Sequence, residues 1–426
     1  MPRMNRPCCI LLPLALIGAA VPTAAAATYE VDSLTALQAR INSAAPGDVI
    51  VVKDGIYTTT APIAIDRKGT AGKPIRIAAK TRGQVEIAGS DGFDLVAGAA
   101  YIEIDGFRFT HASGKTNIRP GATHVRFTRN IFEQQGDGAY LTVAGDDAEV
   151  DRNELRNKRT VGNMIDVRGA GSQIAQRVRI HRNYFHDFTS PGPGTNGAET
   201  IRFGLSGLSM SKGLGVIEHN LFVRCTGENE MLSIKSSANI IQDNTLLDSP
   251  GAQLTLRHGN DNIVRRNYLR GTDGIRIFGD RNRVADNYLE ANTGAIQIGN
   301  GGAEVAEGAP LTSHDRPDDT YITSNVLVNN RRNIFMTARD KGLGATRATI
   351  AHNIIQGGGP AATIEGPFPD PIWRDNTVWD TPAGLMPEEG FVKKKPAIKA
   401  PKALTVEGWR RSASRPRRTA RRVRRR

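Results

Sequence analysis

The amino-acid sequence predicts an all-β fold, namely a right-handed, single-stranded parallel β-helix with a short N-terminal capping helix. Two observations support this fold class. A motif of alternating apolar residues followed by Asn recurs along most of the 426 residues. Long amphipathic helical patterns are scarce, while 45 Gly punctuate the chain, as is typical of many short strands. The length alone would permit two or three domains, but repeat folds break that rule, so one long solenoid is favoured.

The repeat consists of alternating apolar residues, one or two polar residues, Asn, and an apolar pair, as in Val178–Phe185 and Val216–Phe222. Several intervals between successive Asn residues are 20 to 24 residues, which suits one coil of three short strands. A leucine-rich repeat would need Leu-x-x-Leu-x-Leu spacing, and a propeller needs longer repeats. The Asn occupies positions 130, 153, 183, 220, 244, 267, 287, 325, 353 and 376.

Each repeated Asn is expected at the bend between two strands. Asn tolerates a left-handed backbone, and its side-chain amide can bond the Asn of the next coil to form a ladder. The first coils are predicted near Gly47–Val52. A short helix over Leu34–Ile41 would precede them and cover the open end of the shaft, as solenoid ends require.

The N-terminus is typical of an export signal, which we assign to residues 1–27. Arg3 and Arg6 are followed by the apolar run Cys8–Ala20 and by the small residues Ala24–Ala27. The alternative, an uncleaved membrane anchor, is disfavoured because the apolar run is short. We therefore expect a periplasmic or secreted protein with no membrane attachment after cleavage. Only Cys225 then remains, and a free Cys is usually buried and inert.

The positive charge lies almost entirely at the C-terminus. The overall charge of +13 becomes −3 for residues 28–392 once the +14 of residues 393–426 and the +2 of residues 1–27 are set aside. We therefore expect one parallel β-helix domain over 28–392 and a basic, disordered tail over 393–426. The tail could bind polyanions loosely or could be a sequence accident. No nucleic-acid partner is expected from this pattern.

Aligning the coils on their Asn residues reveals four cations at similar places upstream of it. The cations Lys235, Arg257 and Arg276 stand 9, 10 and 11 residues before Asn. Arg202 has the same apolar flanks one coil earlier. Neighbours of inward Ile and Leu point outward, and coils stack about 4.8 Å apart, so we expect one cationic column on one sheet face. Mutually repelling cations at that spacing indicate an anionic ligand.

Carboxylates lie close to this column in the sequence. Glu228 and Glu230 project to the same side of an extended stretch five residues before Lys235, and Asn196 precedes them by one coil. Two carboxylates and an amide oxygen are the hard oxygen ligands that Ca²⁺ takes. Asn196, Glu228 and Glu230 are therefore the predicted calcium ligands.

This combination fits β-elimination of a uronate. The C5 proton becomes acidic once the C6 carboxylate is neutralised, and Ca²⁺ could do this. Lys235 is the predicted base, because nearby positive charge should lower its pKa. Arg257 is the predicted partner of the leaving oxygen, with water able to supply the proton because Arg hardly deprotonates. Arg202, Arg276 and His258 would hold neighbouring sugar carboxylates.

At these residues the sequence resembles polysaccharide lyase family 6, the alginate lyase and chondroitinase B family. Five motifs in order carry the resemblance, which extends over about residues 28–380: Asn196–Arg202, Gly227–Glu230, Lys235–Ser237, Leu254–Asn260 and Gly274–Ile277. It implies a β-helix, calcium at the positions of Asn196, Glu228 and Glu230, a Lys base and an Arg acid. It also implies substrate contacts at Glu199, Arg202, His258 and Arg276. The arginine-rich end departs from the family pattern.

Two other functions could use the same scaffold. A β-helix pectin hydrolase would use clustered acids such as Asp146 and Asp147, but this pair stands apart from the cations. A non-catalytic glycan-binding protein would need the cations but not a Lys beside a carboxylate pair. Among acidic polysaccharides, alginate is favoured over dermatan sulfate, because alginate cleavage is the commoner activity of the family that the chain resembles. The protein is expected to act as a monomer.

Overall fold

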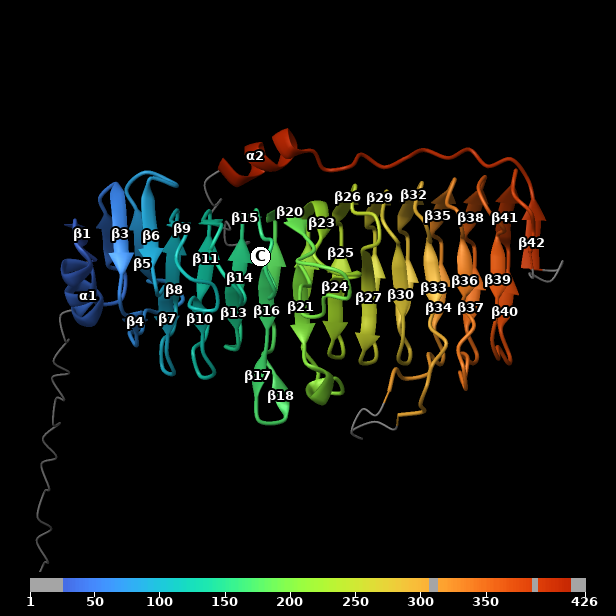
Figure 1. The fold of residues 1–426 in the computed structure, drawn as a ribbon, viewed down its shortest axis with the longest axis horizontal. Helices are drawn as coiled ribbons and strands as arrows, with labels where there is room; N and C mark the ends of the chain where they lie inside the picture. The colour runs from blue at the N-terminus through green and yellow to red at the C-terminus, as the bar shows by residue number, and fades with distance from the viewer. Residues whose placement is uncertain (1–25, 306–312, 385–389, 415–426) are drawn as a thin grey trace, which may run out of the picture.

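The computed structural model describes residues 26–305, 313–384 and 390–414, so residues 1–25 of the expected export signal lie outside the described residues. The chain winds into one long shaft whose three parallel sheets stack coil on coil (Figure 1). The predicted β-helix is confirmed. Within the described residues the sheets contain 14, 14 and 12 strands, which we call sheets A, B and C.

Sheet A contains β1 (Thr28–Val31), β2 (Val49–Val52), β5 (Ile75–Ala79), β8 (Ile102–Asp105), β11 (Arg126–Thr128), β14 (Glu149–Asp151), β19 (Arg179–His181), β22 (Val216–Glu218), β25 (Ile240–Gln242), β28 (Ile263–Arg265), β31 (Arg283–Ala285), β34 (Tyr321–Thr323), β37 (Thr349–Ala351) and β40 (Ile372–Arg374).

Sheet B contains β3 (Gly55–Thr59), β6 (Val85–Gly89), β9 (Arg108–Phe109), β12 (Ile131–Phe132), β15 (Glu154–Arg156), β20 (Tyr184–Thr189), β23 (Leu221–Thr226), β26 (Thr245–Leu247), β29 (Tyr268–Arg270), β32 (Tyr288–Glu290), β35 (Val326–Val328), β38 (Ile354–Gln356), β41 (Asn376–Trp379) and β42 (Phe391–Lys393).

Sheet C contains β4 (Ile63–Ile65), β7 (Phe93–Leu95), β10 (Asn117–Ile118), β13 (Leu141–Val143), β16 (Ile165–Val167), β21 (Ile201–Gly204), β24 (Glu230–Lys235), β27 (Gln253–His258), β30 (Ile275–Ile277), β33 (Ile296–Ile298), β36 (Ile334–Met336) and β39 (Ala362–Ile364). A small antiparallel hairpin, β17 (Gly169–Ala170) and β18 (Gln173–Ile174), and the 3₁₀ helix η1 (Ser206–Leu208) protrude from the coils.

The core fills the shaft along its whole length. In sheet C the inward residues of successive strands, such as Phe203, Ile234 and Leu256, have no exposed surface. Full burial of such a side chain contributes about 1.5–3 kcal/mol to folding. Because side chains alternate along a strand, the residues between them face outward, and this alternation places the polar residues of sheet C on one open face.

The Asn ladder is confirmed between sheets A and B. The backbone N–H and the Nδ2 of Asn220 both donate to Oδ1 of Asn244, at 3.0 Å each, and the same pair of bonds links the other predicted Asn residues in turn. The left-handed backbone, however, falls on the residue before each Asn, for example His219 with φ 55°. The Asn itself is free to direct its amide at the next coil.

The predicted capping helix is also confirmed. Helix α1 (Leu34–Ser43) lies at the first coil, with Leu37 and Ile41 buried against the core. It begins after Ser33, whose Oγ accepts the N–H of Ala36 at 3.2 Å, a bond that satisfies a free donor of the first turn.

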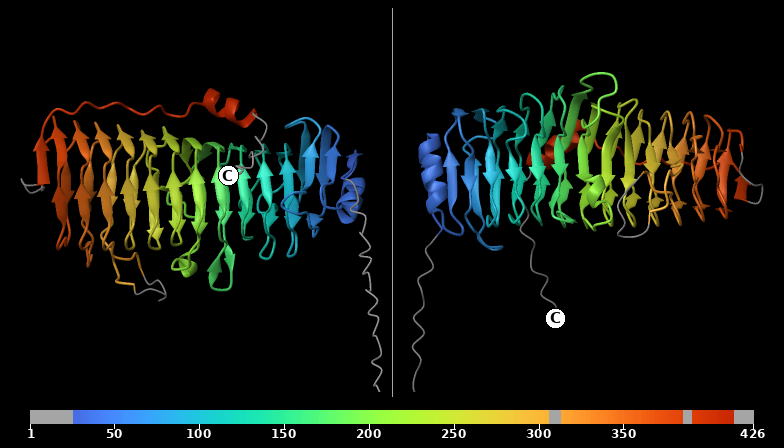
Figure 2. Two further views of the ribbon diagram at one scale, coloured as in Figure 1. Left: turned by 180° about the vertical axis from the view of Figure 1, so that it is seen from behind. Right: turned by 60° about the horizontal axis from the view of Figure 1, so that its bottom comes forward.

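The expected disordered tail is wrong for residues 393–414. After β42 the chain turns back, runs along the outside of the shaft and ends its described course in helix α2 (Val406–Ser414), as Figures 1 and 2 show. Trp409 is 2% exposed, and its Nε1 donates to the carbonyl of Arg182 at 2.6 Å. The apolar contacts of this segment stabilise it on sheet B. Residues 415–426 of the expected tail lie outside the described residues.

Cys225 is a free, buried thiol, as expected. Burial raises the pKa of its thiol to about 12, which keeps the sulfur in its unreactive protonated form at neutral pH. Among the described residues, no helix is long and apolar enough to cross a bilayer.

Candidate active site on sheet C

The predicted site residues gather on the outer face of sheet C, over strands β21, β24, β27 and β30. They do not form the single column that was expected. Arg202 and Arg276 lie at one level, separated by Ser233 and Thr255 of the intervening strands. Lys235 and Arg257 lie further along their strands. A register shift between β24 and β27 pairs Lys235 with His258, so Arg257 is displaced by a β-bulge.

Lys235 is held by a buried carboxylate from the neighbouring coil. Its Nζ donates to Oε1 of Glu199 at 2.9 Å, and Asn163 donates to the other oxygen of Glu199 at 2.6 Å. The side chain of Glu199 is 1% exposed and that of Lys235 is 11% exposed. Burial alone would raise the pKa of Glu199, but the adjacent Lys235 ammonium lowers it, so Glu199 is a carboxylate facing the amine.

Glu230 collects the two arginines. One of its oxygens accepts from both Arg257 and Arg276, and the other accepts from the hydroxyl of Ser233 at 2.6 Å. Burial lowers the pKa of Arg276, and Glu230 opposes that shift. One carboxylate therefore holds two guanidiniums in place.

Glu228 completes a group of three carboxylates. Its Oε2 accepts the backbone N–H groups of Gly197 and Ala198 at 2.6 and 3.0 Å. Burial, together with the charge of Glu199, raises the pKa of Glu228. Oxygens of Glu199, Glu228 and Glu230 lie within 4.8 Å of one another.

These oxygens fit the ligand preference of Ca²⁺, because carboxylates are hard oxygen donors. The grouping differs in part from the predicted ligand set. Glu228 and Glu230 come together, but the third carboxylate is Glu199, which was predicted to touch substrate. Asn196 is exposed in the loop beside Gly197, whose N–H bonds Glu228. Asn196 thus borders the group without being one of the three carboxylates.

Arg202 has a partner that the sequence analysis missed. Its Nε and one terminal nitrogen donate to the two oxygens of Asp166 at 2.9 and 2.8 Å. Asp166 is buried and is the direct Cα neighbour of Arg202 in sheet C. The signal was present in Ile165-Asp166-Val167, which has the same alternation as Ile201–Phe203 one coil later. Arg202 can therefore offer substrate only its remaining N–H groups.

Two histidines lie at the far side of the arginines. His258 and His314 have ring centroids 5.6 Å apart, and His314 stacks on Phe278 at 4.4 Å. Burial, with the charges of His314 and Arg257, lowers the pKa of His258 to about 3. Burial, together with the charges of Arg257 and Arg276, lowers the pKa of His314 to about 4, so both rings are neutral at neutral pH. His314 comes from the long insertion after β33, which lies outside the repeat pattern, so the repeat does not predict its position.

Several polar atoms of this face have no partner although they are buried. Thr255 Oγ1, Arg257 Nε, His258 Nδ1 and Arg276 Nε are among the buried side-chain atoms without a hydrogen bond within the described chain. Such an atom costs about 1–3 kcal/mol. Four of them lie on adjacent strands β27 and β30, so the chain itself does not satisfy all the polar groups of this face.

Projecting segments border the outer face of sheet C, and we call the site face between them the groove. The hairpin β17–β18 and the loop after β33 project beyond the edge of sheet C (Figure 1). On the opposite edge, a pocket between Ser190–Thr195 and Pro250–Gly251 reaches Glu228. Asp146 and Asp147, the acids of the hydrolase alternative, lie elsewhere and face Arg177, which bonds Asp147 at 2.7 Å. That pair does not form part of the groove.

A family profile described as Chondroitinase B matches residues 31–348. The chain belongs to the chondroitinase B family, polysaccharide lyase family 6. The match covers the whole of the groove and its five motifs. A search of curated proteins found no match.

Solved structures of this family have the same fold. The PL6 alginate lyase AlyGC is 25% identical over 90% of this chain, with a TM-score of 0.78, and this chain spans 56% of its length. A mannuronic-acid-specific PL6 lyase from the human gut microbiota is 25% identical, covers 87% of this chain and 92% of its own, and has a TM-score of 0.77. A PL6 alginate lyase in complex with a trisaccharide is 20% identical over 90% of both chains with a TM-score of 0.67, which shows the fold alone.

Proposed function

We propose that this PL6 protein is an exported, calcium-dependent lyase that cleaves alginate by β-elimination, with Lys235 as base and Arg257 as acid. The observation that carries the proposal is the juxtaposition, on one face, of a lysine amine, two arginines with unpartnered donors and a group of three carboxylates. A pectin-type hydrolase would need an acid pair in this groove. A protein that only binds glycans would not need a lysine held against a carboxylate cluster.

The chain's own residues supply the proton transfers. Lys235 would take the C5 proton, the C4–O4 bond would break, and a C4–C5 double bond would form in the sugar left behind. The proton needed by O4 would come from Arg257 or from a water that it orients. In the structure the Lys235 ammonium donates to Glu199, so it would first have to pass one proton to Glu199 or to water, and the neutral amine would then accept the C5 proton.

Arg276 and His258 would position the substrate. The Nε of Arg276 and the Nδ1 of His258 are buried and have no partner in the described chain, and the neutral His258 can donate or accept at this nitrogen. Glu199, Glu228 and Glu230, with Asn196 beside them, would hold Ca²⁺. When bound, this ion would supply the positive charge that neutralises the uronate carboxylate.

Alginate is proposed as substrate because the two relatives at 25% identity are described as alginate lyase and mannuronic-acid-specific lyase. Dermatan sulfate is the second candidate, because the matching family carries the name of chondroitinase B. Both polymers contain a uronic acid that can undergo the same elimination.

The test is ultraviolet absorbance of unsaturated uronate ends after mixing the purified protein with alginate, its mannuronate and guluronate block fractions, or dermatan sulfate. An increase with alginate and its blocks, but not with dermatan sulfate, is expected. An increase with dermatan sulfate alone would replace the proposed substrate. No increase with any polymer, from folded protein supplied with Ca²⁺, would refute lyase function. Export is tested separately by finding a mature N-terminus near Thr28 in protein from the periplasm or medium.

A further inference from the structure

The returning C-terminal segment, residues 394–414, has two different faces; we call it the strap. Its apolar side chains pack on an apolar stripe of sheet B. Trp409 and Ala413 contact the cluster of Tyr184, Leu221 and Val223, while Ile398 and Ala403 pack against Tyr268, Tyr288 and Val328. The backbone N–H of Leu404 also donates to Oγ1 of Thr245 at 3.1 Å. The strap is therefore docked as a defined surface element.

The other face of the strap is cationic. The exposed cations are Lys394, Lys395, Lys399, Lys402, Arg410 and Arg411, and Glu407 is the one acid between residues 394 and 414. None of these six cations makes an ion pair within the described residues, whereas cations on sheet A are paired with carboxylates. A row of unpaired cations fixed along a shaft favours binding of a polyanion.

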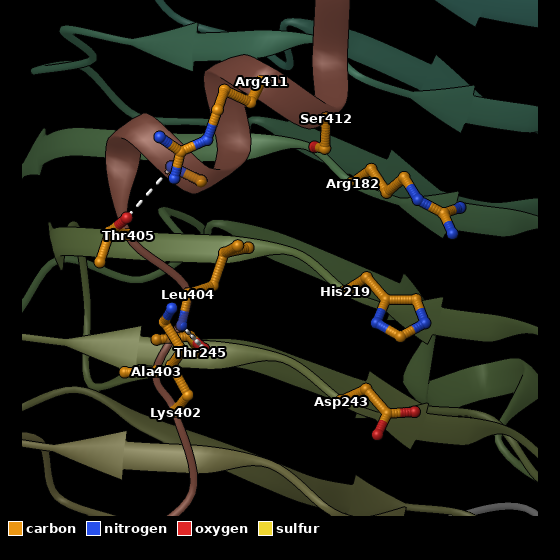
Figure 3. Close-up of a pocket in the computed structure, with 11 residues that line it drawn as sticks. Arg182, His219, Asp243, Thr245, Lys402, Ala403, Leu404, Thr405, Arg411 and Ser412 are labelled. Atoms are coloured by element: carbon orange, nitrogen blue, oxygen red, sulfur yellow. Dashed lines mark hydrogen bonds between the residues drawn. The ribbon is translucent and has the colours of Figure 1, made fainter. Parts of the chain in front are cut away.

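A pocket between the strap and the corner of sheets A and B concentrates this charge. Figure 3 shows Arg182, His219 and Asp243 in a column on successive coils, beside the segment that carries Lys402 and Arg411, and all five residues line the same pocket. Arg182 has no carboxylate partner in the described chain, and burial together with Arg152 lowers its pKa.

Asp243 does not cancel the positive charge of the pocket. Both of its oxygens accept from Arg266, at 2.8 Å each. Three cations thus line one concavity that has no uncommitted acid among the residues lining it.

We propose that the pocket between α2 and sheet B, extended by the cationic face of the strap, is an accessory binding site for the carboxylate groups of an acidic polysaccharide. The identity of the ligand rests on the proposed function, but the site lies on sheet B and is separate from the groove on sheet C. Arg182 and Arg411 can each bind a carboxylate through paired N–H groups. A polymer bound at both surfaces gains affinity by multivalency, whereas a short saccharide can occupy one surface only.

The test uses full-length protein carrying Lys235→Ala, so that the polymer is not degraded, and affinity electrophoresis in gels containing alginate. The triple change Arg182→Gln, Lys402→Gln and Arg411→Gln should weaken retention roughly tenfold, the order of gain expected from a second linked contact. A matched triple of exposed lysines on the first coils, Lys68, Lys73 and Lys80 to Gln, should leave retention within about twofold, since these cations lie outside the site.

Unchanged retention in the strap triple would overturn the proposal, and so would an equal loss in the control triple, because that would reflect net charge alone. If the triple variant loses the docked strap, as shown by a change in tryptophan fluorescence, the double change Lys402→Gln and Arg411→Gln repeats the test with exposed side chains only. The proposal would also be overturned if sodium sulfate displaced the polymer fully while sodium chloride at the same ionic strength did not. Such a result would indicate a general anion site.

The same charge changes in the otherwise native protein separate this proposal from the proposed function. The accessory site predicts a KM raised for long alginate and unchanged for a trisaccharide, with unchanged kcat on both. Absence of cleavage by native protein would refute the lyase assignment, while the retention assay would still decide the accessory site.

Discussion

Sheets A and C carry similar charged residues on their outer faces but use them differently. On sheet A, Arg126 donates to both oxygens of Asp151 at 2.7 and 2.8 Å and to Glu103 at 2.9 Å. On sheet C, Arg257 and Arg276 share one oxygen of Glu230, and the Nε of each has no partner. Sheet A thus satisfies its charges internally, whereas sheet C leaves buried donors without a partner in the described chain.

The difference shows how one scaffold separates stability from function. Stacked coils bring charged residues about 4.8 Å apart on every face, so each face must resolve the repulsion. Alternating acids and bases along the coils do so on sheet A. On sheet C the unpartnered donors lower stability by about 1–3 kcal/mol each, a cost that natural proteins tolerate at functional sites.

The largest effect is expected from the carboxylate that holds the arginines. Glu230→Gln removes the charge that positions Arg257 and Arg276 and that would help bind Ca²⁺, so activity should fall about 10²–10³-fold. Chelation should also lower activity, with Ca²⁺ restoring it better than Mg²⁺, whose geometry is stricter. Glu218→Gln on sheet A, where Glu218 pairs with Arg179, is the matched control and should retain activity. Full activity of protein whose metal content is confirmed as zero would remove calcium from the mechanism.

Replacing one arginine on each of the two sheets tests the comparison itself. Arg126→Gln on sheet A should destabilise the protein by about 1–3 kcal/mol, because the buried Asp151 loses two hydrogen bonds and keeps only Arg152 as its cationic partner in the described chain, and should leave kcat unchanged. Arg276→Gln on sheet C should reduce activity with little loss of stability. Urea unfolding and turnover of both variants provide the measurements. If Arg276→Gln destabilises more than Arg126→Gln, the assignment of the two faces is wrong.

The strap is expected to stabilise the shaft. Trp409→Ala should lower the free energy of unfolding by up to about 3–5 kcal/mol, the range for removing a buried aromatic side chain. The loss is smaller if the strap detaches before the shaft unfolds. Trp379→Ala is the control and should have little effect, because Trp379 is 41% exposed. Truncation after Lys395 should lower the melting temperature in the same way. An unchanged melting temperature in both strap variants would show that docking contributes nothing to stability.

A smaller, pH-dependent effect is expected from His111 in the shaft, which is fully buried and whose pKa burial lowers to about 4. Because the folded-state pKa lies below the unfolded value of about 6.5, its stabilising contribution is present above pH 6.5 and is lost as the pH falls toward 4. The slope is at most about 1.4 kcal/mol per pH unit. Urea unfolding from pH 7 to pH 5 should show a shallower decline for His111→Asn than for the native protein. The exposed His124→Asn should not flatten it.

Much of the fold follows from the sequence because each coil repeats the same local solution. The Asn spacing predicted the ladder and the period of the shaft, and the apolar alternation predicted which residues of Ile201–Phe203 face inward. The site residues could be placed on one face for the same reason. The offset of Lys235 and Arg257 from the level of Arg202 and Arg276 could not be predicted. It arises from a register shift between Ile234 and Lys235, which depends on how β24 and β27 meet.

The strap and part of the site depend on contacts that no period announces. Ile398, Leu404 and Trp409 are few and irregularly spaced among cations, so the segment resembles a solvated tail until sheet B offers an apolar stripe to cover. His314 likewise reaches the groove from an insertion between coils. Glu199 was found by family resemblance, but its bond to Lys235 depends on the stacking of β21 on β24.

The most direct test of the account is the turnover of Lys235→Ala on alginate, measured by the ultraviolet absorbance of the unsaturated product and compared with Lys212→Ala, a nearby exposed lysine. Loss of the general base should reduce turnover about 10²–10⁴-fold in protein that remains folded, while the melting temperature falls because the buried Glu199 loses its cationic partner. Lys212→Ala should behave as the native protein. Turnover of Lys235→Ala within tenfold of the native value would contradict the assignment of Lys235 as base.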